Sequence, residues 1–159
     1  MKKISQILIP VEGTPADEAA LRLGCQIARQ DKAKLLAVYV IEVKRAMALD
    51  TENAPDIDRG ERLLAQAEQT AKQLGVKIET ELLQARLVGP TIINEVTERN
   101  VDLIIMGIPY HDSMGEFRLG DTTGYVMKTA TCQVWLCRQP SKEIEDDKPK
   151  KHVDFSLAD

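Results

Sequence analysis

Asp102-Leu103-Ile104-Ile105-Met106-Gly107 is the most apolar stretch of this sequence, and it decides the fold. A short apolar run between a charge and a glycine is typical of a strand buried on both faces, as in the middle of a parallel sheet. We therefore predict the central strand here. A loop over residues 108–119, a helix over residues 121–130 and a last strand over residues 133–138 are expected to follow.

The same alternation of strand and helix repeats upstream. The stretch from about 44 to 58 contains Asn53-Ala54-Pro55-Asp56 and is typical of a loop, with room for one short helical turn. Five strands alternating with four helices predict an α/β fold with a five-stranded parallel sheet and helices on both faces. The remaining predicted strands are 7–11, 34–41 and 76–83, the last an outer strand, and the remaining helices cover 16–29, about 63–74 and a short stretch from Gly89.

The first helix has a recognisable start. Thr14 can cap it, Pro15 suits its first position, and Asp17 three residues after Thr14 approximates a capping box. We therefore expect the Thr14 side chain to cap the helix.

Composition limits the classes of function. The 159 residues are enough for one domain, and a net charge of −4 gives no reason to expect nucleic-acid binding. No apolar run approaches the length of a membrane span, and the start of the chain lacks a signal-peptide pattern, so we expect a cytoplasmic protein. Three cysteines without C-x-x-C spacing and only two histidines do not favour a zinc site, and we predict no metal site built from them.

The chain divides into a folded part and a tail. Residues 1–138 carry the strand and helix patterns and form the predicted domain. Residues 139–159 are rich in lysine and acidic side chains and poor in apolar ones, so we expect a charged, disordered tail.

In parallel α/β sheets, ligands bind beyond the carboxyl ends of the strands, where the strand order reverses. This rule selects the segments 12–14, 40–44 and 107–121. Gly107 would let the backbone approach a ligand closely, and Gly120 would expose the first N–H groups of a helix, which bind phosphate well.

Met1 to Arg138 resembles the universal stress protein family. The start is similar to the family's I-L-V-P-V-D-G-S, Gly89-Pro90-Thr91 is similar to its G-x-P, and residues 102–138 follow its D-L-I-V-M-G strand, long loop, L-G turn, helix and final strand. The resemblance implies a single Rossmann-like domain of the adenine-nucleotide alpha-hydrolase type. It also implies a stress-response or regulatory module. The sequence has no H-x-G-H and no S-G-G-x-D-S loop, which related nucleotide-binding α/β folds use for adenylyl transfer, so we expect a binding module and not an enzyme.

The nucleotide-binding motif of the family is altered here. ATP-binding members carry G-x2-G-x9-G-[ST], whereas this chain has Gly107 and Gly120 with Tyr110 and Asp121 at the other two positions, a G-x2-Y-x9-G-D loop. Glu12 stands where the family has an aspartate. The resemblance places candidate nucleotide-binding residues at Pro10, Val11, Glu12, Gly13, Thr14, Val40, Met106, Gly107, Tyr110, Gly120, Asp121, Thr122 and Thr123.

These changes leave two interpretations open. In one, Tyr110 fills the phosphate space, Asp121 caps the last helix and repels phosphate, and no ATP binds. In the other, Tyr110 stacks on a base, Thr122 or Thr123 replaces the lost hydroxyl, and the pocket holds AMP, ATP with or without Mg²⁺, or another adenine nucleotide. Glu12 and Asp121 could hold such a metal, so a slow metal-dependent nucleotide hydrolase is the alternative function.

The predicted last strand carries Val134, Trp135 and Leu136 at an edge of the sheet. An apolar edge favours pairing with another chain, and family members commonly dimerise there, so the resemblance implies a homodimer. The alternative is that the tail after Arg138 covers this edge.

Overall fold

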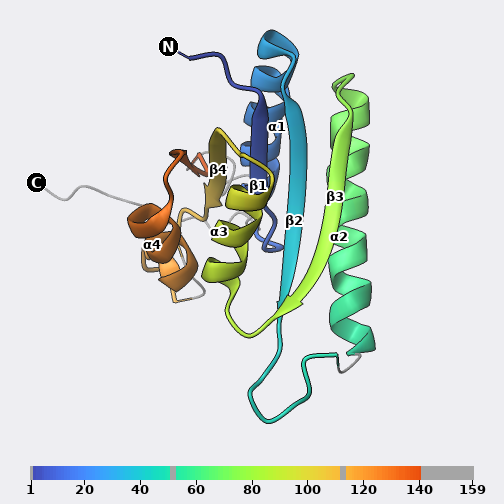
Figure 1. The fold of residues 1–159 in the computed structure, drawn as a ribbon, viewed down its shortest axis with the longest axis vertical. Coiled ribbons are helices and arrows are strands. Elements are labelled where there is room, and N and C mark those ends of the chain that lie inside the picture. Colours follow the sequence, from blue (N-terminus) through green and yellow to red (C-terminus); the bar gives the residue numbers. More distant parts are fainter. Residues whose placement is uncertain (1, 51–52, 112–113, 141–159) are drawn as a thin grey trace, which may run out of the picture.

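The computed structural model describes residues 2–50, 53–111 and 114–140. Within them the chain alternates strands and helices, as Figure 1 shows, which confirms the predicted fold class. The predicted tail lies outside the described residues, apart from Gln139 and Pro140. The elements are β1 (Gln6–Pro10), α1 (Ala16–Asp31), β2 (Lys34–Glu42), α2 (Ala54–Gln73), β3 (Ile78–Ala85), α3 (Val88–Glu98), β4 (Leu103–Ile108), α4 (Gly120–Thr129) and β5 (Gln133–Arg138).

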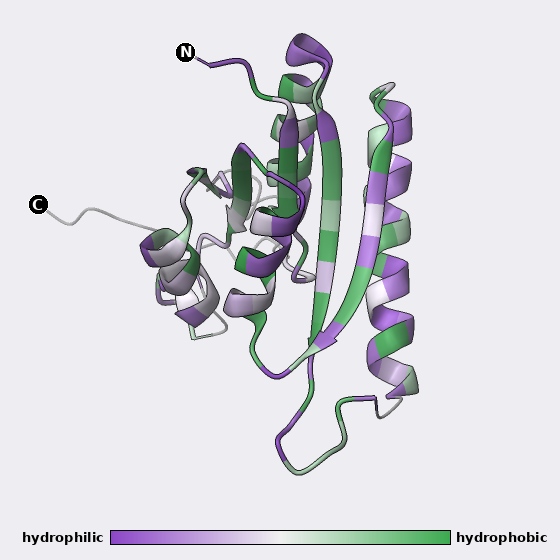
Figure 2. Ribbon diagram, in the orientation of Figure 1, coloured by the Kyte–Doolittle hydropathy of each residue, from purple (hydrophilic) through white to green (hydrophobic). Residues whose placement is uncertain are grey.

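The five strands form one parallel sheet in the order β3-β2-β1-β4-β5. The central strand is therefore β1, and the prediction that residues 102–107 form it is wrong by one position in the sheet. Both strands are apolar over most of their length in Figure 2, and both are buried. Hydropathy alone therefore cannot say which of two fully buried strands is the middle one.

Helices cover both faces of the sheet, as predicted. The contacts pair α1 with α2 on one face and α3 with α4 on the other. Alternate side chains of β1 divide between the two layers: Ile7 and Ile9 belong to the core under α1 and α2, and Leu8 to the core under α3 and α4. Full burial of each such side chain contributes about 1.5–3 kcal/mol, so the alternation fixes the register of the strand.

The helix α2 begins at Ala54, so the prediction of a loop from about 44 to 58 is wrong for its last five residues. Pro55 occupies the first turn, where its missing N–H costs nothing, and the Asn53 side chain donates to Asp56 at 2.7 Å. The same residues that favour a turn also favour a helix start. Buried Gly60 then lets the helix pass close to Tyr39 and Leu82.

β3 lies at one edge of the sheet, as predicted, but begins two residues later than expected. The Val76 N–H donates to the Ala71 carbonyl at 2.9 Å, so Val76 completes the end of α2 and does not start the strand.

Candidate functional site

The predicted site segments meet at the carboxyl edge of the sheet. The strand order reverses between β1 and β4, whose ends carry Val11 and Gly107. Pro10 pairs with Val38 in register, and the Val11 N–H donates to the Val38 carbonyl at 2.8 Å. Half-buried Val40 therefore lies two residues further along the neighbouring strand, close to the turn after β1.

The β1–α1 turn, residues 11–17, is held by a carboxylate. Asp17 accepts the Gly13 N–H at 2.7 Å and the Glu12 N–H at 3.2 Å, while Gly13 takes a positive φ of 86°. The prediction that Thr14 caps the helix is wrong. Pro15 occupies the cap position, and the buried Thr14 hydroxyl has no hydrogen-bond partner among the described residues. The N–H groups of Glu12 and Gly13 donate to Asp17, so neither of them donates to the Thr14 hydroxyl oxygen.

Two acids interact in this turn. Desolvation by burial raises the pKa of Asp17, although the N–H donors of Gly13 and Glu12 and the positive charge of Arg59 act in the opposite direction. Desolvation also raises the pKa of Glu12, and the neighbouring Asp17 carboxylate adds to this effect. The acid that acts on Glu12 is therefore Asp17, a residue that the sequence suggested only as part of a capping box.

Arg59 of α2 reaches the same turn, which sequence reasoning missed. Its Nη1 donates to the Tyr39 hydroxyl at 3.0 Å, and its Nη2 lies 2.4 Å from where a Cβ on Gly13 would stand. The guanidinium therefore covers Gly13. The signal that could have found it was the helix start at Asn53-Ala54-Pro55, which places Arg59 in the second turn of α2.

The side of Gly107 where a side chain would stand faces the start of α1. A Cβ there would lie 2.4 Å from the Ala16 carbonyl oxygen and 3.1 Å from the Asp17 nitrogen. The absent side chain lets the first turn of α1 pack on the end of β4. Gly107 is thus needed to join the two halves of the site, and the contacted atoms are backbone atoms with little freedom to move. Buried Met106, just before it, belongs to the core under α3 and α4.

Tyr110 stands just past β4, with 37% of its surface exposed. The Arg138 guanidinium carbon lies 5.0 Å from the centre of its ring, within the range of a cation–π contact. This contact holds the ring at the ends of β4 and β5.

The start of α4 contains the last part of the altered motif. Gly120 takes a φ of 78°, a conformation that favours glycine, and among the described residues no atom beyond its chain neighbours lies within 4 Å of where a Cβ would stand. Leu119 occupies the cap position without a side-chain cap, so the prediction that Asp121 caps this helix is wrong. Asp121 is exposed in the first turn, Thr122 is half-buried, and Thr123 is buried.

The two edges of the sheet differ in their side chains. In β3, Glu79 and Glu81 both pair with Arg99, which also binds the buried Glu95 of α3. In β5, the three residues expected at an interface are apolar: Val134 and Trp135 are half-buried against opposite core layers, and Leu136 is 36% exposed.

The described residues contain neither a cluster of metal ligands nor a membrane-spanning helix. No group of three or more His, Cys, Asp or Glu side chains there could hold a metal ion. In the same part of the chain, we find no helix of the length and apolar character needed to cross a membrane.

Comparison with known proteins identifies the family. The Universal stress protein family profile matches residues 3–138. "Universal stress protein MJ0531" of Methanocaldococcus jannaschii is 28% identical over 144 residues, which cover 87% of this chain and 84% of that protein.

Two solved structures share the fold. The Archaeoglobus fulgidus universal stress protein in complex with dAMP has a TM-score of 0.67 and 18% identity, covering 85% of this chain and 98% of that one. An Arabidopsis thaliana family protein with AMP bound has a TM-score of 0.63 and 19% identity, covering 90% and 97%. From the profile match over most of its length, the chain belongs to the universal stress protein family.

Proposed function

We propose that this chain is a regulatory, stress-response module of the cytoplasm that binds an adenine nucleotide at the carboxyl edge of its sheet, between β1 and β4. The observation that carries the proposal is the buried Thr14 hydroxyl, which finds no hydrogen-bond partner in the described part of the chain and lies at the point where the strand order reverses. A buried polar group without a hydrogen bond costs about 1–3 kcal/mol, which a ligand's hydrogen bond would offset. Family structures with dAMP and with AMP support the class of ligand.

The altered loop favours a nucleotide with few phosphates. The exposed Asp121 carboxylate lies in the first turn of α4, where a phosphate chain would otherwise meet free N–H groups. Arg138 and the His111 ring, whose centroid lies 5.7 Å from that of Tyr110, both contact the Tyr110 ring, and the exposed 37% of Tyr110 is the surface that remains for a base. Thr122, half-buried, is better placed than buried Thr123 to supply a hydroxyl to a ligand. We therefore expect AMP to bind more tightly than ATP.

Calorimetry with AMP, ATP and adenosine, with and without Mg²⁺, tests this proposal. The double variant Tyr110→Gly with Asp121→Ser restores the family's motif, and it should bind ATP roughly ten- to a hundredfold more tightly because a carboxylate–phosphate repulsion is removed. Glu61→Ser, which removes a carboxylate from an exposed position of α2 outside the motif, is the control and should leave the ATP affinity unchanged. Failure of the unaltered chain to bind any of the three ligands would contradict the proposal.

We further propose that the module acts as a homodimer paired through β5. Exposed apolar Leu136 favours pairing at this edge, whereas the charged cluster around Arg99 disfavours it at β3. Leu136→Lys is the sharpest test, because Trp135 also packs on the core and its loss would disturb the fold. Light scattering should show a dimer of the 17.7 kDa chain and a monomer of the variant. A monomeric unaltered chain would contradict this arrangement.

A further inference from the structure

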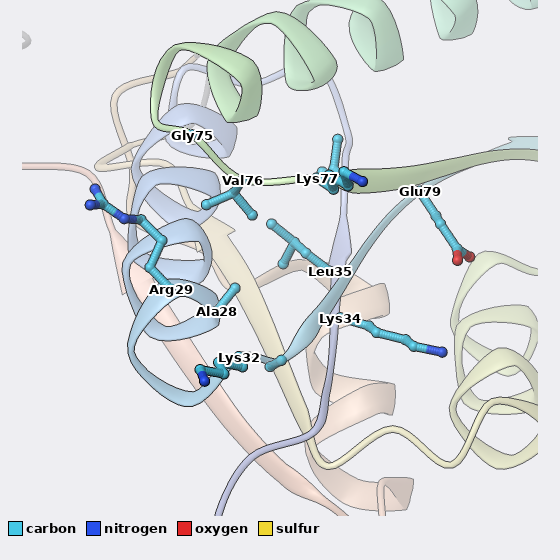
Figure 3. A pocket seen from close by; sticks show the side chains of 11 residues that line it. Ala28, Arg29, Lys32, Lys34, Leu35, Gly75, Val76, Lys77 and Glu79 are labelled. Carbon is cyan, nitrogen blue, oxygen red and sulfur yellow. The ribbon is translucent and has the colours of Figure 1, made fainter.

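A second open space lies at the opposite edge of the sheet from the candidate nucleotide site. A cavity of about 690 Å³ opens at the amino ends of β2 and β3, where α1 and α2 end, as Figure 3 shows. Its volume falls within the range of about 300–1,000 Å³ that ligand sites occupy. We name this space the amino-end groove.

The floor of the amino-end groove is apolar and recessed. Ala28, Leu35 and Val76 point toward a common space in Figure 3, and Ile78 also lines the cavity. Ala28 is 4% exposed and Leu35 only 1%, whereas Val76 and Ile78 are half-buried. Because these side chains do not protrude, they cannot insert into a lipid surface, and an occupant must extend its own apolar group down to them.

The rim of the groove is positively charged. It carries Arg29, Lys32, Lys34 and Lys77, and Figure 3 shows them placed around the apolar centre. Within residues 2–50, 53–111 and 114–140, none of these four cations takes part in a salt bridge. The acid on the rim, Glu79, already pairs with Arg99 at 3.3 Å.

Helix ends explain only part of this charge. The C-termini of α1 and α2 face the groove, and each contributes about half a negative charge. Two helix ends therefore balance about one of the four cations. The remainder is a local positive excess on a chain whose net charge is −4.

We propose that the amino-end groove binds an acidic peptide segment of a partner protein, with one aliphatic side chain on the floor and carboxylates on both sides of it. Charge complementarity requires an anionic occupant, and the apolar floor requires an aliphatic group between the charges. A nucleic-acid backbone would leave the floor unused, and an anionic membrane cannot reach it. This surface lies away from the nucleotide site, so the proposal does not depend on nucleotide binding.

Fluorescence anisotropy with a labelled pentapeptide of sequence DELED tests the proposal on the full chain. Lys32→Glu with Lys77→Glu should weaken binding at least about tenfold, because two attractions become repulsions. Lys44→Glu with Lys128→Glu changes the net charge equally at exposed positions outside the groove and should leave binding unchanged. The peptide DESED, which lacks the aliphatic side chain, should bind at least about fivefold more weakly.

Circular dichroism and thermal unfolding establish that both charge variants are folded. Equal binding of DELED by the two double variants would overturn the proposal, and so would equal binding of DELED and DESED. Absence of DELED binding at millimolar protein would also overturn it. Binding to vesicles that contain phosphatidylserine is measured last. If the chain binds these vesicles, and Lys32→Glu with Lys77→Glu weakens that binding while Lys44→Glu with Lys128→Glu does not, the groove binds a membrane and the peptide proposal is contradicted.

Discussion

The β1–α1 turn and the β4–α4 loop (residues 109–119) border the same edge of the sheet but are built differently. In the turn, Asp17 accepts backbone donors, Arg59 covers Gly13, and Ala16 packs on Gly107. In the loop, Met114 and Phe117 are 79% and 56% exposed. The turn is fixed by backbone and buried contacts, whereas much of the loop's apolar surface faces solvent.

This difference teaches where a substitution should act. A change in the turn alters contacts that the fold itself uses, so it should lower the free energy of unfolding. A change at a largely exposed side chain of the loop, such as Phe117, removes few packing contacts, so it should have little effect on stability.

Gly107→Ala should lower the free energy of unfolding by about 3 kcal/mol, because the new Cβ meets the backbone of Ala16 and one of the two must move. Urea unfolding measures the effect. Gly124→Ala in α4 is the matched control: a Cβ there meets nothing, and it should stabilise the helix by about 0.5–1 kcal/mol. A neutral Gly107→Ala would mean that the turn is looser than the structure indicates.

Asp17→Ala should destabilise the chain by about 1.5 kcal/mol at neutral pH, because the N–H groups of Glu12 and Gly13 lose a charged acceptor. Asp31→Ala is the control: it removes a carboxylate that accepts one backbone N–H outside the turn, that of Ile4 at 3.1 Å. If Asp31→Ala lowers the free energy of unfolding more than Asp17→Ala does, Asp17 is not what holds the β1–α1 turn in place.

Asp17→Asn should change the pH dependence of stability. The raised pKa means that the folded state holds the Asp17 proton more tightly than the unfolded state does. The free energy of unfolding therefore falls as pH rises from the ordinary value of 3.8 through the raised pKa, and this contribution disappears in the variant. Across that pH interval, the free energy of unfolding of the variant should therefore rise relative to that of the unaltered chain. Parallel pH profiles would show that Asp17 is not desolvated.

Arg59→Met should cost about 1 kcal/mol, because it removes the hydrogen bond to Tyr39 and the charge that favours ionised Asp17. Arg62→Met, on an exposed position of the same helix, is the control and should be neutral within about 0.5 kcal/mol. If the two substitutions change the free energy of unfolding equally, Arg59 does not stabilise the β1–α1 turn.

Phe117→Ser should change the free energy of unfolding by less than about 0.5 kcal/mol, because the side chain is largely exposed in the loop. Thermal unfolding measures it. A loss above about 1 kcal/mol would show that the loop packs as the turn does, and the comparison between them would fail.

The sequence by itself determined the architecture. Strand runs such as Ile7–Val11 and the helical spacing of residues 16–29 specify a parallel α/β sheet, because hydrophobic periodicity and the alternation of elements are local properties. The motif in residues 102–121 likewise identified the family and the edge of the sheet that carries the candidate site.

Only the tertiary structure decided how the candidate site is filled. Gly107 carries the signature of a ligand-binding glycine, yet its free space is occupied by Ala16, 91 positions earlier in the chain. Arg59 reaches Gly13 from a helix whose first turns look like a loop, and Asp17 holds the turn before α1 while Thr14 caps nothing. The contacts of Gly107 and Arg59 join residues far apart in sequence, and Asp17 and Thr14 are neighbouring groups that could each have bonded in the turn. Both outcomes depend on packing distances, which no local sequence pattern contains.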